Sequence, residues 1–462
     1  MSYSLIIIGA GLSGIAAGIR CARFGHKVLI LEKHAIAGGL NSYYYRKGRL
    51  LETGLHAMTN FADPADKHAP LNILFRQLKL SRKKFSTHEQ LSSLIYFPEG
   101  RTLKFSNHLG DLREEVARLF PESSESFQEL VRIVEAYDPF VNAPYISTRQ
   151  RLKEILGNEI LADMILWPIM MYGSCRENDI DFSQFVIMFR AIYEEGFFRP
   201  EGTVKDFLDM LLAHYEHVGG EIRFKSGVRS IRKQNGRVNG VRLESGEEID
   251  CDYVISTAGY PATLDFLGRN EPEKRLPYEG RMSFFEDINI VPIAIRKDLL
   301  AEHTIIFYHL DETLNYCRPS EDINPNCGVI CFSDNFQGIG LEDTMQIRVT
   351  HPANYEIWKN AGKERYEAMK AEASRRSREI VAKIIGNYHE KIVYHDSFTP
   401  VTVEKFTAKA QGAVYGSPIK LKDGRTDFEN LFVAGTDQGF LGIVGSMLSG
   451  VTIVNEHILA KL

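Results

Sequence analysis

The stretch Leu5-Ile6-Ile7-Ile8-Gly9-Ala10-Gly11-Leu12-Ser13-Gly14 decides the fold of this chain. Its first four residues are apolar and mostly β-branched, which predicts a short buried strand. The apolar spacing that follows, at Ile15, Ala16 and Ile19, is typical of a helix. The three glycines therefore lie where a strand turns into a helix.

Glycine suits each of these three positions for a different reason. Gly9 permits the tight turn, Gly11 lets a phosphate group approach the backbone, and Gly14 allows the helix to pack close to the strand. The N–H groups of the first helical turn, at Leu12 and Ser13, and the positive end of the helix dipole favour a bound pyrophosphate. The stretch thus predicts a nucleotide-binding loop.

A second buried strand is predicted for Lys27-Val28-Leu29-Ile30-Leu31-Glu32, which completes a strand–helix–strand unit. The carboxylate of Glu32 at its end is suited to accept hydrogen bonds from both ribose hydroxyls of an adenosine. It would also repel a 2′-phosphate, which disfavours NADP. The alternative interpretation of Glu32 is a solvated residue at the end of a strand.

Composition excludes several classes of protein. The chain has 462 residues, of which 44% are apolar and 25% charged, and this argues against disorder, collagen and coiled coil. A net charge of −5 argues against nucleic acid as the main partner. The length predicts two interwoven domains, or one large α/β domain with an insertion.

The cysteines and the N-terminus indicate a cellular compartment. Six cysteines include no Cys-x-x-Cys pair, so we expect reduced thiols and no metal site. Cys327 and Cys331 fit a strand better than a metal site. No signal peptide precedes Leu5, and no run reaches the roughly 18 apolar residues of a membrane-spanning helix. We expect a cytoplasmic protein in which any membrane contact is peripheral.

Farther along, the pattern predicts a series of elements. They are helical pieces between Asp63 and Tyr137, a helix from Pro200 to Val218, short strands from Glu221 to Ile249, a separate buried strand Tyr253–Gly259, a β-rich region over 281–350, one long helix Tyr355–Ile385, a strand at Leu431–Gly435 and a closing helix Ser446–Leu459.

The segment after Glu32 does not continue the pattern of a nicotinamide dehydrogenase. It reads Ala37-Gly38-Gly39-Leu40-Asn41-Ser42, then a predicted hairpin, then Glu52-Thr53-Gly54-Leu55-His56-Ala57-Met58. This order resembles the FAD-binding amine-oxidase and phytoene-desaturase superfamily, and Glu52 to His56 looks especially like carotenoid desaturases. The resemblance implies that Gly38 and Gly39 wrap the cofactor pyrophosphate and that Gly54, Leu55 and His56 run along the flavin.

Four more parts of the chain extend the resemblance. Pro200-Glu201-Gly202, Gly219-Gly220 and Val228 are similar to the adenine-side segment, and Ile255-Ser256-Thr257-Ala258 to the strand beneath the cofactor. Thr399-Pro400-Val401-Thr402 with Gly412–Gly416 is similar to the branch of bacterial phytoene desaturases, carotenoid isomerases and retinol saturases. The segment from Val433 to Gly450 resembles the part that closes over the flavin, where a helix N-terminus points at the N1–C2=O edge and stabilises negative charge.

The resemblance predicts FAD as cofactor and the following cofactor-binding residues: Gly9, Gly11, Leu12, Ser13, Gly14, Glu32, Lys33, Gly38, Gly39, Leu40, Gly54, Leu55, His56, Val228, Thr257, Ala258, Gly435, Asp437, Ile443, Val444 and Gly445. Two positions depart from the family. Leu40 stands where many members have an arginine, so the pyrophosphate cation is expected elsewhere, at Lys33 or Arg46. Asp437 is either a ribityl or pyrophosphate contact or a helix cap.

The expected substrate is apolar. The segment Leu161–Phe198 is rich in Met and Phe and predicts helices that are apolar around most of their circumference. These residues either line an apolar cavity or membrane entrance, or form ordinary core. His56 is the candidate catalytic residue, because the motif places an imidazole near the flavin, where it could transfer a proton; otherwise it is a hydrogen-bonded spacer.

The leading interpretation is an FAD-dependent oxidoreductase that desaturates, or in reverse saturates, a C–C bond of an apolar polyene or lipid. A redox-neutral isomerase that uses reduced flavin, a non-catalytic flavoprotein and an amine oxidase are the alternatives. We expect an α/β fold with a discontinuous Rossmann-type FAD-binding domain (1–75, 200–275 and 405–462) and a mixed α+β substrate-binding domain (76–199 and 276–404). The active site is expected where they meet. The sequence does not indicate which oligomeric state the protein adopts.

Overall fold

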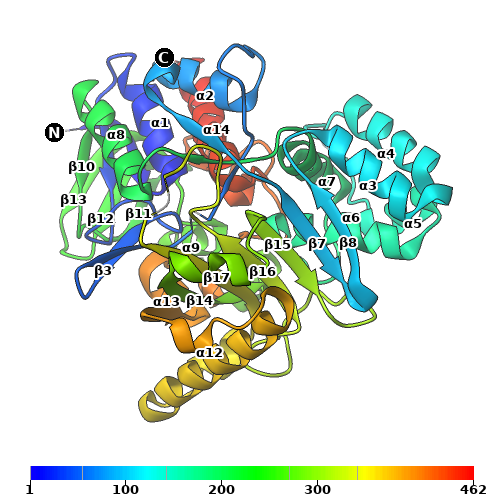
Figure 1. Cartoon of the computed structure of the whole chain (residues 1–462). Coiled ribbons are helices and arrows are strands. Elements are labelled where there is room, and N and C mark those ends of the chain that lie inside the picture. The colour runs from blue at the N-terminus through cyan, green and yellow to red at the C-terminus, as the bar shows by residue number, and fades with distance from the viewer. Residues whose placement is uncertain (1, 55, 142, 270, 341, 462) are drawn as a thin grey trace.

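The computed structural model describes residues 2–54, 56–141, 143–269, 271–340 and 342–461. Two seven-stranded sheets form its framework (Figure 1). The first contains, in spatial order, β10 (Glu221–Arg223), β2 (Val28–Leu31), β1 (Tyr3–Ile8), β13 (Glu248–Ser256), β12 (Arg237–Leu243) and β11 (Val228–Gln234), with β19 (Leu431–Val433) paired to β13. Its strands come from three distant parts of the chain.

Four helices cover one face of this first sheet. They are α1 (Leu12–Ala22), α2 (Pro70–Leu78), α8 (Val204–His217) and α14 (Gly442–Ile453), whose apolar side chains share one core with the sheet. A second core lies on the opposite face, beneath the β11–β12 hairpin. The parallel strands are buried on both faces, which explains their continuous apolar sequences.

Strand β13 joins two different pairings. From Glu248 to Asp250 it pairs antiparallel with β12, and from Cys251 to Ser256 it pairs parallel with β1. Its last residues also pair with β19. The expected break between Ile249 and Tyr253 is therefore wrong, because the alternating outer half and the apolar inner half belong to one continuous strand.

The second sheet has the order β18 (Tyr394–Phe398), β14 (Ser283–Pro292), β17 (Thr344–Ala353), β16 (Cys327–Phe332), β15 (Ile305–His309), β7 (Ser93–Phe97) and β8 (Arg101–Phe105). One face packs against the helices α3 (Leu109–Leu119), α4 (Ser124–Ala136), α5 (Thr148–Leu156), α6 (Glu159–Gly173) and α7 (Phe182–Phe189). The other face packs against α12 (Lys363–Ile385). The expectation of helical pieces over 63–137 missed the hairpin of β7 and β8, because the other partner of β7, strand β15, lies far along the chain.

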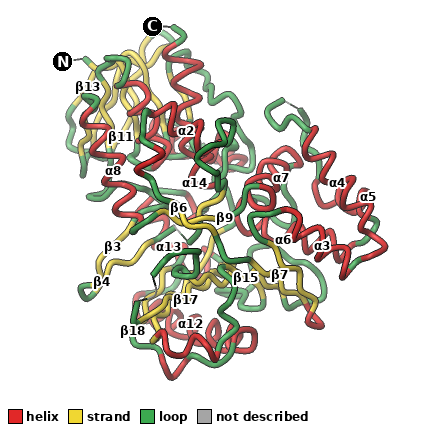
Figure 2. The backbone as a smooth tube through the Cα atoms, turned by 45° about the horizontal axis from the view of Figure 1, so that its top comes forward, coloured by secondary structure: helices red, strands yellow, loops and turns green. Residues whose placement is uncertain are grey.

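Small β elements join the two sheets. The strands β5 (Met58–Thr59), β9 (Phe197–Pro200) and β6 (Thr87–Glu89) form a three-stranded sheet, whose β6 and β9 lie in the middle of Figure 2. The expected hairpin is present as β3 (Tyr43–Arg46) and β4 (Arg49–Glu52). These elements connect the strand–helix–strand unit to the second sheet.

The later helices differ from expectation at their ends. The predicted helix Tyr355–Ile385 is two helices, α11 (Tyr355–Lys359) and α12, because Gly362 takes an extended conformation at the start of α12. The remaining helices are α9 (Tyr260–Phe266), α10 (Pro272–Arg275) and α13 (Pro400–Thr407). The predicted closing helix begins at Gly442 instead of Ser446 and continues as the π-helical turn η10 (Val454–Leu459).

The stretch Gly442–Leu459 is, by length and mean composition, apolar enough to cross a membrane. However, 56% of it is buried inside the protein, and α14 packs against α1 in the core of the first sheet. A core helix accounts for its composition.

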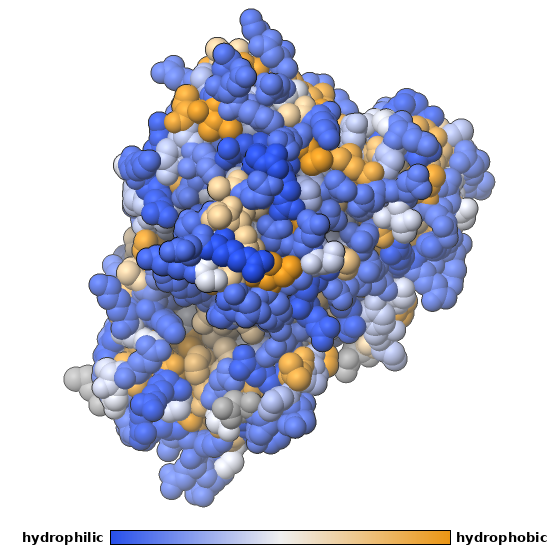
Figure 3. Space-filling model, turned by 90° about the horizontal axis from the view of Figure 1, so that it is seen from below, coloured by the Kyte–Doolittle hydropathy of each residue, from blue (hydrophilic) through white to orange (hydrophobic). Residues whose placement is uncertain are grey.

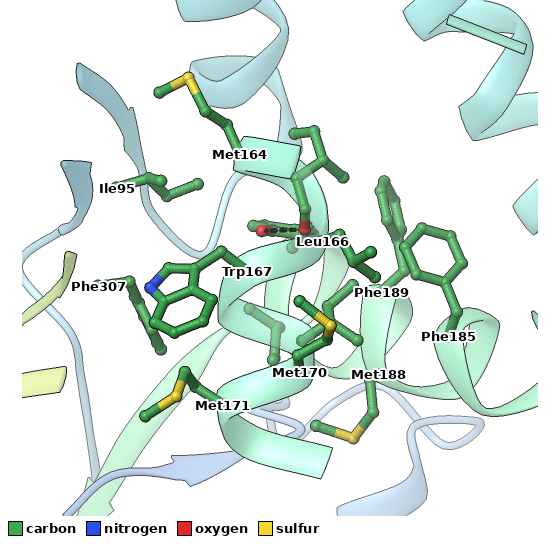
Figure 4. Close-up of a cluster of buried hydrophobic side chains, with 14 of the residues drawn as sticks. Ile95, Met164, Leu166, Trp167, Met170, Met171, Phe185, Met188, Phe189 and Phe307 are labelled. Atoms are coloured by element: carbon green, nitrogen blue, oxygen red, sulfur yellow. Dashed lines mark hydrogen bonds between the residues drawn. The ribbon is translucent and has the colours of Figure 1, made fainter. Parts of the chain in front are cut away.

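The Met- and Phe-rich segment forms a packed core. In Figure 4, Trp167 points toward Phe307 on one side of α6, whereas Phe185 and Phe189 of α7 lie on the opposite side. Side chains of the segment are almost entirely buried in this cluster. The structure thus shows that Leu161–Phe198 form ordinary core rather than the wall of a cavity.

Polar residues dominate the surface seen from below, where apolar residues form small separate groups, one of them in a hollow (Figure 3). All six cysteines are free, and Cys327 and Cys331 lie on the buried strand β16. No cluster of metal-ligating side chains occurs among the described residues.

Candidate functional site

The turn between β1 and α1 has the backbone that the glycine spacing predicts. Gly9 has a φ of +101°, a conformation that L side chains rarely adopt. A Cβ on Gly14 would overlap the carbonyl oxygen of Gly9, so only glycine lets the helix lie this close to the turn. A Cβ on Gly11 would meet no atom within 4 Å. Gly11 therefore borders open space.

The second glycine loop lies against the first. Gly38 N donates to Ala10 O (2.8 Å), and Gly11 and Gly38 form a parallel bridge. A Cβ on Gly39 would lie 3.4 Å from Gly11 Cα, and Gly39 has a φ of +60°. Two motifs that are well separated in sequence thus form one glycine-lined wall.

Leu40 and Gly54 bring a third segment to this wall. The hydroxyl of Thr53 donates to Leu40 O (2.8 Å), and a Cβ on Gly54 would lie 2.5 Å from the same carbonyl oxygen. Gly54 is therefore required for this close approach. Leu55 lies outside the described residues.

The ends of β13 and β19 complete the surroundings of the loop. Thr257 Oγ1 donates to Ile8 O (2.9 Å), and it would lie 2.7 Å from a Cβ on Gly9. Ala258 follows it at the C-terminal end of the strand. Gly435, with a φ of +100°, packs on the side chain of Ser13. The structure thus brings these positions together around the β1–α1 turn.

Glu32 lies at the end of β2, beside this turn. One carboxylate oxygen accepts from Ala10 N and the other from His34 N, both at 2.7 Å. Each oxygen keeps a lone pair for a further donor. Ser226 N donates to Glu32 O (2.8 Å), which brings the start of β11 at Val228 to the same end of the sheet.

The two candidate pyrophosphate cations are engaged with acids. Lys33 Nζ lies 3.5 Å from Glu244 Oε1, and Arg46 Nε lies 3.5 Å from Asp396 Oδ2. Both basic side chains are well exposed. These ion pairs do not indicate which of the two side chains binds the pyrophosphate.

Asp437 is buried and holds two loops. Its carboxylate accepts from Tyr260 N (2.6 Å), the first residue of α9, and from Ser417 N (2.9 Å). Burial would raise its pKa, but the charges of Lys409 and Lys420 and these N–H groups lower it below the ordinary value. Asp437 does not cap α14, which starts after Leu441 without a side-chain cap. It instead binds the first turn of α9.

Helix α14 starts beside the linking strands, and no side chain of the described residues caps its first N–H groups. Ile443 and Val444 are buried, Gly445 is half-buried, and a Cβ on Gly442 would lie 2.8 Å from Thr59 Oγ1. This arrangement provides a positive helix end close to the segment that follows His56.

His56 belongs to a buried charged set. Its Nε2 lies 2.9 Å from Glu286 Oε1 and 3.0 Å from Oε2. Arg348 Nε donates to Glu286 Oε1 (2.7 Å), and Arg348 Nη2 donates to that oxygen and to the carbonyls of Glu52 (3.0 Å) and Thr53 (2.9 Å). Arg348 is fully buried. Burial would raise the pKa of Glu286, but Arg348 and His56 lower it below its ordinary value.

The residues around the β1–α1 turn fit an extended dinucleotide. The space beside Gly11 is open, and the hydroxyl of Ser13, at the start of α1, is buried without a hydrogen-bond partner among the described residues. Helices α1 and α14 both begin without side-chain caps. Unpaired donors at two helix N-termini suit a pyrophosphate at one end and a flavin at the other.

A family model described as flavin containing amine oxidoreductase matches residues 12–293. The chain belongs to this family. FAD is thus its cofactor, and the protein is an FAD-dependent oxidoreductase with the expected α/β fold, which confirms the expectations of family, fold class and cofactor.

Three similar proteins extend over nearly the whole of this flavoenzyme. A 4,4'-diaponeurosporene oxygenase of Staphylococcus aureus is 23% identical over 99% of the chain and 98% of its own length. A chloroplastic prolycopene isomerase of Daucus carota is 23% identical over 97% of the chain and 79% of its own length. The structure of an oxidoreductase from Methanosarcina mazei has a TM-score of 0.68 at 17% identity, covering 98% of this chain and 100% of that one.

Sequence reasoning missed Glu286 and Arg348. The available signal was the pair Glu286-Asp287 inside a mostly apolar strand, since buried acids require partners. Neither residue belongs to a motif of the flavoenzyme that the sequence displayed.

Another buried acid of the flavoenzyme makes its stability depend on pH. Glu195 Oε2 accepts from Asn60 Nδ2 (2.7 Å), and burial raises the pKa of Glu195 from 4.5 to about 7. The folded state therefore binds this proton more tightly than the unfolded state, so the free energy of unfolding falls as pH rises from about 4.5 to 7. Replacing Glu195 with Gln should remove this loss.

We expect Glu195→Gln to match the parent near pH 4.5 and to exceed its unfolding free energy by about 3 kcal/mol above pH 7. Urea unfolding across this range measures the difference. Glu216→Gln, at an exposed position on α8, is the control and should show no such trend. An equal difference at all pH values for Glu195→Gln would contradict the expectation.

Proposed function

We propose that this flavoenzyme desaturates C–C bonds of an apolar polyene, isoprenoid or long-chain lipid. The observation that carries the proposal is the similarity along 99% of the chain to a 4,4'-diaponeurosporene oxygenase, whose name denotes a carotenoid substrate. Bound FAD supplies the hydride acceptor for such a reaction. The protein supplies binding, orientation and proton transfer.

We assign these tasks to different residues of the chain. The carboxylate of Glu32 is placed for the adenosine ribose, and the N-termini of α1 and α14 stabilise negative charge on the pyrophosphate and the flavin. An apolar substrate needs no ionic contact with the protein, since each buried CH₂ contributes about 0.8 kcal/mol to binding. We assign to His56 the role of holding or returning a proton near the flavin.

A redox-neutral isomerase is the second candidate, favoured by the similarity to a prolycopene isomerase along 97% of the chain. The two candidates differ in electron count. Dehydrogenation reduces one oxidised flavin per double bond formed, whereas isomerisation requires reduced flavin and leaves it reduced.

We expect anaerobic mixing of the oxidised enzyme with an acyclic carotene, supplied in phosphatidylcholine vesicles, to bleach the flavin absorbance as a more unsaturated product forms. Product that forms only after pre-reduction, with no net flavin oxidation, would establish the isomerase instead. Absence of product from both forms, together with flavin reduction by an aliphatic amine, would overturn both candidates and establish an amine oxidase.

We also propose a cytoplasmic location with peripheral membrane contact. The six free cysteines favour a reducing compartment. The loop after α4 exposes 63% of Phe140 and 57% of Val141, and the ring of Phe140 lies 5.8 Å from that of Phe440, just before α14. This loop is the surface we assign to the membrane, and sedimentation of the protein with phosphatidylglycerol vesicles tests it.

A further inference from the structure

Strand β14 carries two neighbouring buried acids that point to opposite faces of the second sheet. Glu286 meets His56 and Arg348 on one face. Asp287 meets His395 (2.7 Å) and Arg378 (3.3 Å) on the other. The two sets have the same composition, but only that of Glu286 touches the segment predicted to run along the flavin.

The bonds around Glu286 determine which nitrogen of His56 carries a proton. Glu286 is ionised, because the charge of Arg348 lowers its pKa despite burial, and an ionised carboxylate only accepts hydrogen bonds. His56 Nε2 must therefore be the donor. In the neutral imidazole this leaves a lone pair on Nδ1, which makes no hydrogen bond to any described residue.

Arg348 fixes the distance between the acid and the histidine segment. It binds the Glu286 carboxylate and, through Nη2, the carbonyls of Glu52 and Thr53, only a few residues before His56. The guanidinium thus holds both partners of the His56–Glu286 bond. Its Nη1 is buried without a partner among the described residues, as is Nη2 of Arg378 in the set of Asp287.

We propose that Glu286 and Arg348 are positioning residues that hold His56 as the Nε2–H tautomer, so that Nδ1 is the atom that accepts and returns the proton of the flavin reaction. The inference rests on the proposed function. In desaturation, one carbon loses a hydride to FAD, and the adjacent C–H bond breaks as its proton passes to Nδ1. That C–H electron pair becomes the new π bond, and Glu286 stabilises the resulting imidazolium.

The test uses holoenzyme labelled with ¹⁵N-histidine, in which the His56 signals are assigned with a His56→Asn variant. In its neutral form, His56 of the parent should show a protonated Nε2 and a bare Nδ1. Glu286→Gln should shift this pattern toward a mixture of tautomers, because an amide can donate as well as accept. Asp287→Asn is the matched control and should change only the His395 signals.

Turnover of the acyclic carotene provides the second readout. We expect Glu286→Gln to lower kcat about 100-fold while KM changes little, which is the size of a general-base contribution. Asp287→Asn should retain the parental kcat. Arg348→Lys keeps the charge but not the planar fork, and should lower kcat with a partial shift of the tautomer pattern.

The outcomes separate this inference from the proposed function. A His56 pattern that is the same in parent and Glu286→Gln, or that shows a proton on Nδ1 in the parent, would overturn it. If Glu286→Gln does not fold, the His56 signals of the parent still decide whether Nε2 or Nδ1 carries the proton, and Arg348→Lys then tests the positioning role. A parental pattern as expected, together with no turnover of any polyene, would contradict the proposed function while leaving the tautomer assignment in place.

Discussion

Gly11→Val should give a folded protein that no longer retains FAD and is therefore colourless after purification. A Cβ on Gly11 meets no protein atom within 4 Å, and the residue has φ −68° and ψ 168°, which valine adopts without strain. The added methyl groups would occupy the open space beside the turn, where the pyrophosphate has to approach the backbone. Flavin absorbance per protein and circular dichroism measure the two parts of this expectation.

Gly362→Val provides a matched control. Gly362 also precedes a helix, has nearly the same φ of −61° and ψ of 161°, and also borders open space, but it lies at the start of α12. It should remain yellow. Gly11→Val protein that retained a full complement of FAD would contradict the assignment of this turn to the pyrophosphate.

Arg348→Met should lower the free energy of unfolding by about 3–5 kcal/mol, because it leaves the buried carboxylate of Glu286 without its cation. The side chain of Arg348 is 0% exposed and that of Glu286 4%, so water cannot replace the lost bonds. Urea unfolding of FAD-loaded protein, at one FAD concentration for all variants, measures the change.

Two comparisons make this result specific. Arg232→Met removes a guanidinium that binds Asp250 (2.7 Å) at the surface, and should cost less than about 1 kcal/mol. The double variant Glu286→Gln/Arg348→Met removes both charges and should be more stable than Arg348→Met alone. Equal losses for Arg348→Met and Arg232→Met would show that the buried pair is unimportant for stability.

The nucleotide-binding turn could be predicted from the sequence because its determinants are local. Gly9 needs a positive φ, and Gly14 needs contact with a carbonyl five residues earlier, so spacing alone reports the geometry. The convergence of Gly38 and Gly54 on this turn was not visible in local patterns. That convergence was expected only from the resemblance to the flavoenzyme family. The structure shows the close contacts that require glycine at positions 38 and 54.

The charged set at His56 could not be predicted in the same way. In β17, Met345, Ile347 and Val349 alternate with Gln346 and Arg348, a pattern that is typical of a strand with one solvated face. Arg348 is nevertheless fully buried. The reason is tertiary, because the neighbouring strand β14 supplies the acid and the end of β4 supplies a carbonyl, and together they satisfy the guanidinium.

The composition of Leu161–Phe198 was likewise open to two interpretations, since helices apolar on all sides suit a cavity wall as well as a core. What decides between them is the set of neighbours. Strands β7 and β15 and helix α7 all pack against α6, and the two strands come from distant parts of the sequence.

The double pairing of β13 sets the order of events during biosynthesis. Its inner half needs β19 as an edge partner, and Gly450 of α14 packs directly on the backbone of Ser13 in the nucleotide-binding turn. A nascent chain therefore lacks part of the sheet and the support of that turn until residues 431–462 have left the ribosome. We therefore expect the flavin to bind only after this part of the chain has been made, and we expect a polypeptide terminated before Leu431 to expose the apolar faces of β13 and α1 to aggregation.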